Sequence, residues 1–229
     1  MIDSNLTRRI DRRAAGLVSA LVLAGAAFAG CRSAYYSTME AFGVHKRELL
    51  VDRVEEGRDA QEAAKEEFQD ALEAFRAMSG FRGEEGLETI HSKLSRQLQR
   101  SEARAEEVRA RIGAIERVAG DLFEEWQDEI RRIQKRELRA RSQELLAQTR
   151  ERYEDLIESM NRAEQRMEPV LSVFRDHVLF LKHNLNAQAI ASLRGDLAEV
   201  EADVGALIRE MEAAIAESEA FLARMQGPR

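Results

Sequence analysis

Residues 193–225, LRGDLAEVEADVGALIREMEAAIAESEAFLARM, decide the fold. Small and apolar side chains recur in this stretch at alternating steps of four and three residues. This heptad spacing is typical of a long α-helix that packs one face against other helices. Ile208, Ile215 and Leu222 lie beside the main series and widen the apolar face, which favours a bundle over a two-stranded coiled coil. The main series is Leu193, Leu197, Val200, Val204, Leu207, Met211, Ala214, Ser218, Phe221 and Met225.

Three upstream segments repeat this pattern, and the third of them begins with Leu138, Ser142 and Leu145. The composition agrees, because 34% charged and only 6% aromatic residues are typical of long helices with narrow apolar faces. No run of alternating β-branched residues between turns indicates a strand. The three segments are residues 54–78, 98–133 and 138–181.

Three breaks interrupt the helical sequence. Residues 79–86 contain three glycines, and Gly80 can take the left-handed conformation that ends a helix. Asn186 can cap a helix that begins at Ala187. The third break falls near residues 135–137, where the heptad series slips.

We therefore expect four helices with short connections, which make neighbouring helices antiparallel. The expected fold is all-α, an up-down four-helix bundle or coiled-coil rod over residues 38–225. An alternative keeps residues 87–168 as one protruding helix, with three-helix packing elsewhere. Pro169 would kink the third helix or start its second half. The expected helices are 38–79, 87–134, 138–183 and 187–225, followed by a tail at 226–229.

The N-terminus carries a targeting signal. Cys31, the only cysteine, ends the uncharged run Ala14–Gly30, and four arginines precede that run. A basic region, a short apolar run, small residues and then cysteine predict a bacterial lipoprotein signal peptide over residues 1–30. The run is shorter than the roughly 20 residues of a spanning helix. We expect a lipidated Cys31 followed by a tether over residues 31–37; an uncleaved membrane anchor is the alternative.

The residues around Cys31 also predict where the protein works. Arg32 follows the cysteine, where an aspartate commonly retains lipoproteins at the inner membrane. An arginine at this position favours an outer-membrane lipoprotein that faces the periplasm of a Gram-negative host. In a Gram-positive host, the outer leaflet of the membrane is the alternative. Loss of residues 1–30 removes four arginines and two aspartates, which changes the net charge from −7 to −9. Such a surface repels phosphate backbones, so nucleic acid is not an expected partner.

Four stretches carry a family resemblance: CRSAYY at residues 31–36, GVHKRELLVDRV at 43–54, MEPVL at 167–171 and VLFLKHNLNA at 178–187. They resemble the signatures of an uncharacterised bacterial family, domain of unknown function 2959. The resemblance covers essentially the whole mature chain and implies a helical, lipoprotein-like envelope protein. It supplies no catalytic residues.

Sequence motifs of the commoner enzyme classes do not occur, such as a Gly-rich phosphate loop or paired cysteines. The one Glu-x-x-His motif, Glu88–His91, is half of what a di-iron bundle needs. We therefore expect no enzymatic activity, no cofactor and no metal. We interpret the polar residues within the heptad series as fixing helix register, and a ligand cavity lined by them is the alternative. These residues are Gln61, Ser101, Ser142, Thr149 and Ser218.

The expected topology separates two functional ends. The first helix starts at the lipid, so residues 79–86 and 184–186 would lie at a membrane-distal tip, and the turn near residue 135 would return to the membrane. We interpret the distal tip as a surface for a periplasmic partner. We interpret the turn as a contact for anionic headgroups, where each basic residue adds about 1 kcal/mol. The tip candidates are Phe81, Phe180, Lys182, His183, Asn184 and Asn186, and the headgroup candidates are Arg131, Arg132, Lys135, Arg136, Arg139 and Arg141.

Together these inferences predict a non-enzymatic envelope lipoprotein that acts as a helical spacer or adaptor. Self-association through the apolar helix faces stays open. Two other functions also stay open: a ligand carrier or enzyme that uses the bundle interior, and a coiled-coil protein anchored in the inner membrane.

Overall fold

The computed structural model describes residues 46–79, 86–184 and 187–226. These residues form α2 (Lys46–Ser79), α3 (Leu87–Arg132), α4 (Arg136–His183) and α5 (Ala187–Gln226), and no strand occurs among them. The predicted all-α helical bundle is confirmed. The first part of the expected first helix, residues 38–45, lies outside the described residues. Residues 227–229 of the expected tail also lie outside them.

The break between α3 and α4 is a three-residue turn without glycine or proline. Ile133 is extended, with φ −69° and ψ 117°, and its N–H donates to the carbonyl of Ile130 over 3.2 Å. The guanidinium of Arg139 donates to the Ile133 carbonyl from Nε at 2.9 Å and from Nη2 at 2.6 Å. A side chain from the next helix therefore satisfies a carbonyl at the end of α3, and the chain reverses instead of continuing as one helix. The prolyl residue Pro169 lies inside α4, which continues on both sides of it.

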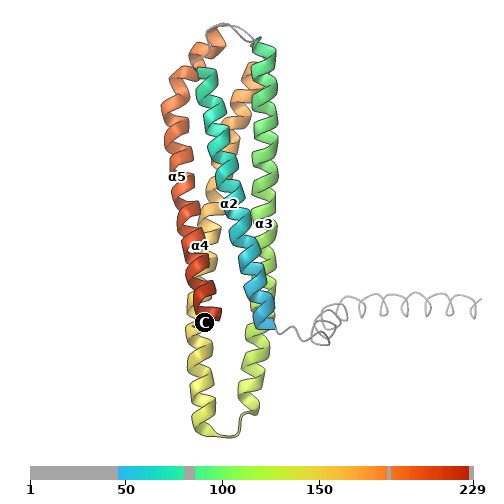
Figure 1. The fold of residues 1–229 in the computed structure, drawn as a ribbon, viewed down its shortest axis with the longest axis vertical. Helices are drawn as coiled ribbons and strands as arrows, with labels where there is room; N and C mark the ends of the chain where they lie inside the picture. The colour runs from blue at the N-terminus through green and yellow to red at the C-terminus, as the bar shows by residue number, and fades with distance from the viewer. Residues whose placement is uncertain (1–45, 80–85, 185–186, 227–229) are drawn as a thin grey trace, which may run out of the picture. The chain divides into compact units, whose positions relative to one another are not determined.

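Ion pairs between helices give the directions in which neighbours run. Arg111 of α3 pairs with Glu56 of α2 at 2.7 Å, and Arg100 pairs with Glu67 at 2.9 Å. Residue numbers rise along α2 as they fall along α3, so these two helices are antiparallel. The pair Arg76–Glu201 joins α2 to α5 at 2.6 Å. The ribbons of the described helices lie side by side from Leu49 onward (Figure 1).

The core is formed by the inner faces of the helices. Gly57 of α2 leaves a space that two neighbours fill, because a Cβ atom there would lie 2.8 Å from Ile115 Cδ1 of α3 and 3.1 Å from Met160 Cε of α4. The ends of two long side chains from other helices therefore pack against this glycine. The largest fully buried side chains are Phe68, Phe75, Phe221, Leu50, Ile115, Leu156, Met160, Met167, Leu181, Leu193, Leu207 and Met211.

The helices differ in length, and this difference creates a two-helix extension. Arg162 and Arg166 of α4 both lie 3.8 Å from Glu210 of α5, so the register places Gln226, the end of α5, level with about residue 148 of α4. Figure 1 shows α3 and α4 continuing together past the C-terminal end of α5. We call residues 126–147 the hairpin, and we call the rest of the described bundle the four-helix segment.

Candidate functional site

The hairpin exposes two leucines that the heptad series placed on an inner face. Leu138 is 54% exposed and Leu145 is 47% exposed, so the prediction that they are buried is wrong. The reason is the number of neighbouring helices. Leu138 lies 18 residues, or five turns, before the fully buried Leu156, and Leu145 lies five turns before the fully buried Ala163. The same face of α4 is covered in the four-helix segment and uncovered in the hairpin.

Contacts between α3 and α4 hold the hairpin together without these leucines. Ile130 and Leu146 are buried, at 4% and 8% exposure. The indole Nε1 of Trp126 donates to Ser142 Oγ over 3.1 Å. Tyr153 packs edge-on against Phe123 at the base, with 5.3 Å between ring centroids. Burial, with a smaller effect from Glu116, raises the pKa of Tyr153 to about 12.

The predicted headgroup residues gather at the end of the hairpin. All except Arg139 are exposed, and Arg139 is half-buried because it closes the turn. Arg131 pairs with Asp128, and Lys135 lies 3.6 Å from Glu137. No ion pair is found among the described residues for the three remaining cations, which are Arg132, Arg136 and Arg141.

The opposite end of α4 holds the other predicted surface. Phe180 is 41% exposed, and Lys182 and His183 are exposed. Asn184 instead ends the helix, because its Nδ2 donates to the Phe180 carbonyl over 3.0 Å. The neighbouring Leu179 is 56% exposed and belongs to the same apolar run, residues 178–181, as Phe180. Phe81, Asn186 and the predicted lipidation site Cys31 lie outside the described residues.

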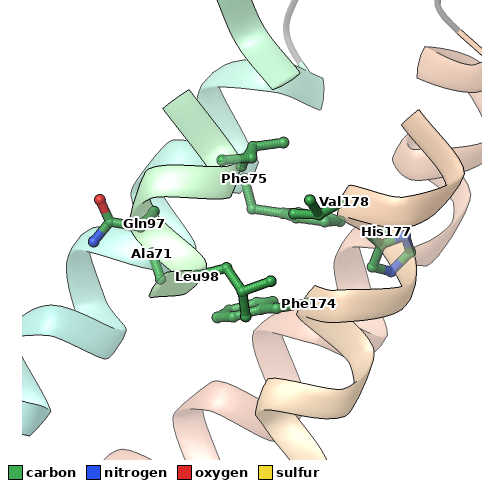
Figure 2. A pocket seen from close by; sticks show the side chains of 8 residues that line it. Ala71, Phe75, Gln97, Leu98, Phe174, His177 and Val178 are labelled. Atoms are coloured by element: carbon green, nitrogen blue, oxygen red, sulfur yellow. The ribbon is translucent and has the colours of Figure 1, made fainter. Parts of the chain in front are cut away.

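A small cavity of about 10 Å³ lies below this end, between α2, α3 and α4 (Figure 2). Its wall includes Phe75, Phe174 and His177. The Phe75 ring meets the imidazole of His177 edge-on, with 5.0 Å between the centroids. Burial lowers the pKa of His177, against opposing effects of Asp196, Asp176 and Glu199. The volume suits about one water molecule, so this cavity is packing space rather than a ligand site.

Polar residues in the bundle interior occupy two environments. Gln61, Ser101 and Ser218 are fully buried in the four-helix segment. Ser218 Oγ donates to the Ala214 carbonyl over 2.7 Å, whereas the amide of Gln61 and the hydroxyl of Ser101 have no hydrogen-bond partner among the described residues. Ser142 and Thr149 are half-buried, so they do not share this interior environment.

Within residues 46–79, 86–184 and 187–226, no three His, Cys, Asp or Glu side chains come together as metal ligands would. In Glu88–His91, the imidazole Nε2 lies 3.5 Å from Ser95 Oγ. In the same ranges, no helix has both the length and the apolar character to cross a bilayer.

The model of one protein family, the proteins of unknown function DUF2959, matches residues 35–225. The chain belongs to the DUF2959 family. The predicted resemblance is therefore confirmed, and the matched range takes in the four described helices except for the last residue of α5. No curated protein and no solved structure matches the chain. The hairpin and the exposed end of α4 are thus surfaces of a DUF2959 bundle.

Proposed function

We propose that this DUF2959 protein is a non-enzymatic lipoprotein of the bacterial outer membrane, facing the periplasm. It is anchored through Cys31 and acts as a helical spacer or adaptor. The support for the anchor is the sequence order of four arginines, the uncharged run Ala14–Gly30 and Cys31. Helices of 34 to 48 residues are about 50 to 70 Å long, which suits a spacer.

The observation that carries the adaptor role is the exposure of Leu179 and Phe180 at the end of α4. Exposure of these adjacent large apolar side chains, at 56% and 41%, is unfavourable in water, and burying them in an interface would lower the free energy. Lys182 and His183 follow them and supply a polar rim. This combination fits a protein partner that buries the two apolar side chains and leaves the charged ones at the edge.

Fatty-acid labelling with membrane fractionation tests the anchor. The native chain should incorporate label and fractionate with the outer membrane, whereas Cys31→Ala should remain unlabelled. If the native chain is unlabelled and stays in the inner membrane, the anchor is the uncleaved segment of residues 14–30 and not a lipid on Cys31.

Photo-crosslinking tests the adaptor surface. A photoreactive residue at Phe180 in the native envelope should give one discrete adduct, which Leu179→Asp should abolish. The matched control is a photoreactive residue at Gln165, which is exposed on the same helix but lies in the four-helix segment. Equal adducts from both positions, or adducts unaffected by Leu179→Asp, would refute the adaptor surface.

A further inference from the structure

We infer that the hairpin is a second membrane contact, a site for a phospholipid surface that contains anionic headgroups. The inference rests on the proposed envelope location and deepens it, because it assigns a ligand to a surface other than the adaptor end. The site combines the exposed arginines at the turn with the uncovered leucines of α4.

The end of the hairpin is strongly basic. Residues 131–141 contain six basic side chains and one acidic side chain, in a chain whose net charge is −7. Arg132, Arg136 and Arg141 are exposed and have no ion pair with any described residue. A guanidinium near an anionic leaflet gains favourable Coulomb energy that falls off within about a Debye length, so the end of the hairpin is the place where such a gain is available.

Exposed apolar side chains accompany these arginines on α4. Leu138, Arg141 and Leu145 fall within about 60° of each other around α4, so one face presents two leucines with an arginine between them. A basic and apolar face of this kind binds at the interface between headgroups and acyl chains. Leucine enters the apolar side of that interface, and the long arginine side chain extends back to the phosphates.

The same charges argue against a second copy as the occupant of this face. A two-fold contact between hairpins would bring Arg132, Arg136 and Arg141 of both copies together. Like charges at an interface oppose association, whereas an anionic lipid surface attracts all of them.

Chain length permits both membrane contacts at once. Antiparallel pairing of Glu56 with Arg111 places Leu49 level with about residue 118, so the turn at residue 133 lies roughly 22 Å further along α3. The 18 residues from Cys31 to Leu49 span up to roughly 60 Å when extended. A lipid on Cys31 and the end of the hairpin can therefore reach the same leaflet.

The test places an environment-sensitive fluorophore at the turn. Gln134→Cys in the full chain carries NBD, and the chain is reconstituted into vesicles of phosphatidylcholine alone or mixed with phosphatidylglycerol. We expect a blue shift and a several-fold intensity gain with phosphatidylglycerol, reversed by high salt, and no change in pure phosphatidylcholine. The label at Gln165→Cys should change in neither. If Cys31 is found unacylated, the same labels are placed in Cys31→Ala chains.

The variants separate a specific site from general charge. Arg132→Gln, Arg136→Gln and Arg141→Gln together should abolish the shift, since roughly fivefold per arginine multiplies to on the order of 100-fold in partitioning. The matched control removes three exposed arginines from the four-helix segment, Arg96→Gln, Arg117→Gln and Arg224→Gln, and should leave the shift unchanged. Circular dichroism of both triple variants checks that the helices are retained.

Several outcomes would overturn the inference. A label at residue 134 that stays in water while the chain floats with anionic vesicles would leave the anchor standing and refute the hairpin contact. A concentration-dependent shift without vesicles would show that a second copy covers this face. Acylation is read separately by mass, so a failed anchor and a failed hairpin contact give different results.

Discussion

The two halves of α4 present the same apolar face to different surroundings. In the four-helix segment Leu156 and Ala163 are fully buried, whereas Leu138 and Leu145, five turns earlier on that face, are about half exposed. The heptad pattern therefore specifies which face of a helix is apolar, and the length of the neighbouring helices specifies whether that face is covered. A face that is apolar but uncovered is where a partner or a membrane can bind.

Polar side chains are hydrogen-bonded in the hairpin, whereas one buried amide in the four-helix segment is not. In the hairpin, Trp126 donates to Ser142, and Arg139 donates to the Ile133 carbonyl. In the four-helix segment, the Gln61 amide is fully buried without a partner among the described residues. Polar side chains near solvent are easily satisfied, whereas an enclosed interior makes an unpaired amide costly.

The largest expected effect comes from truncating an aromatic side chain in the four-helix segment. Phe68→Ala removes a fully buried ring and should lower the free energy of unfolding by about 3–5 kcal/mol. Leu145→Ala in the hairpin should change it by less than about 0.5 kcal/mol, because that side chain is already half exposed. Urea unfolding followed by circular dichroism measures both. Comparable losses would mean that a neighbour covers Leu145 in the isolated protein, which would remove the contrast between the two regions.

Substitutions at two glycines test whether the interior of the four-helix segment is more tightly packed than the helix surface near the hairpin. Gly57→Leu should destabilise the protein by about 1–3 kcal/mol, because even a Cβ atom would lie 2.8 Å from Ile115 Cδ1. Gly120→Ala near the hairpin should stabilise it by about 0.5–1 kcal/mol, since no atom lies within 4 Å of the added Cβ and alanine favours the helix. Melting temperatures of the two variants should move in opposite directions. A stabilising Gly57→Leu would contradict the close packing of α2, α3 and α4.

The sequence predicted the helices well because both their periodicity and most of their ends depend on residues close together in the chain. Periodicity marks the long segments, and the glycines of residues 79–86 mark one connection. The turn at residues 133–135 has no such breaker, and the break was expected only because the heptad series slips there. The structure supplies the contact that sequence reasoning missed, the bond from Arg139 to the Ile133 carbonyl.

Burial in the hairpin could not be predicted in the same way. The periodicity of Leu138 and Leu145 equals that of the buried residues further along α4, so nothing local distinguishes them. Their exposure follows from the position where α5 ends, which is a property of the assembled bundle. The basic side chains at the turn were predictable as a cluster, but the bond from Arg139 to the Ile133 carbonyl follows only from the folded turn.

Replacing the unpaired amide tests the polar contrast. Gln61→Leu should raise the free energy of unfolding by about 1–2 kcal/mol, because it removes a buried group whose donors and acceptor are unsatisfied. Gln97→Leu is the matched control. It removes a buried amide that donates to the Glu67 carbonyl over 3.3 Å and should lower the free energy by about 1 kcal/mol. A destabilising Gln61→Leu would mean that water or a ligand satisfies the amide, and would favour a carrier function of the interior.

The smallest expected effect is a pH dependence at His177, beside the cavity of the four-helix segment. Burial lowers its pKa in the folded protein, while Asp196, Asp176 and Glu199 oppose that shift. The unfolded chain therefore binds a proton at a higher pH than the folded one does. The stability contributed by a neutral His177 is fully present above the ordinary histidine pKa of about 6.5 and is lost as the pH falls below it.

His177→Phe removes this titration and keeps a ring against Phe75. In the native chain, the centroids of the Phe75 ring and the imidazole lie 5.0 Å apart. Urea unfolding at pH 7.5 and pH 5 should show a smaller pH-induced loss for the variant than for the native chain. Glu and Asp titrations contribute equally to both proteins at these pH values, so the difference between the two losses isolates the imidazole. Equal losses would mean that His177 protonates in the folded bundle as readily as in water, and the packing of α4 against α2 at this level would then be as open to solvent as the hairpin.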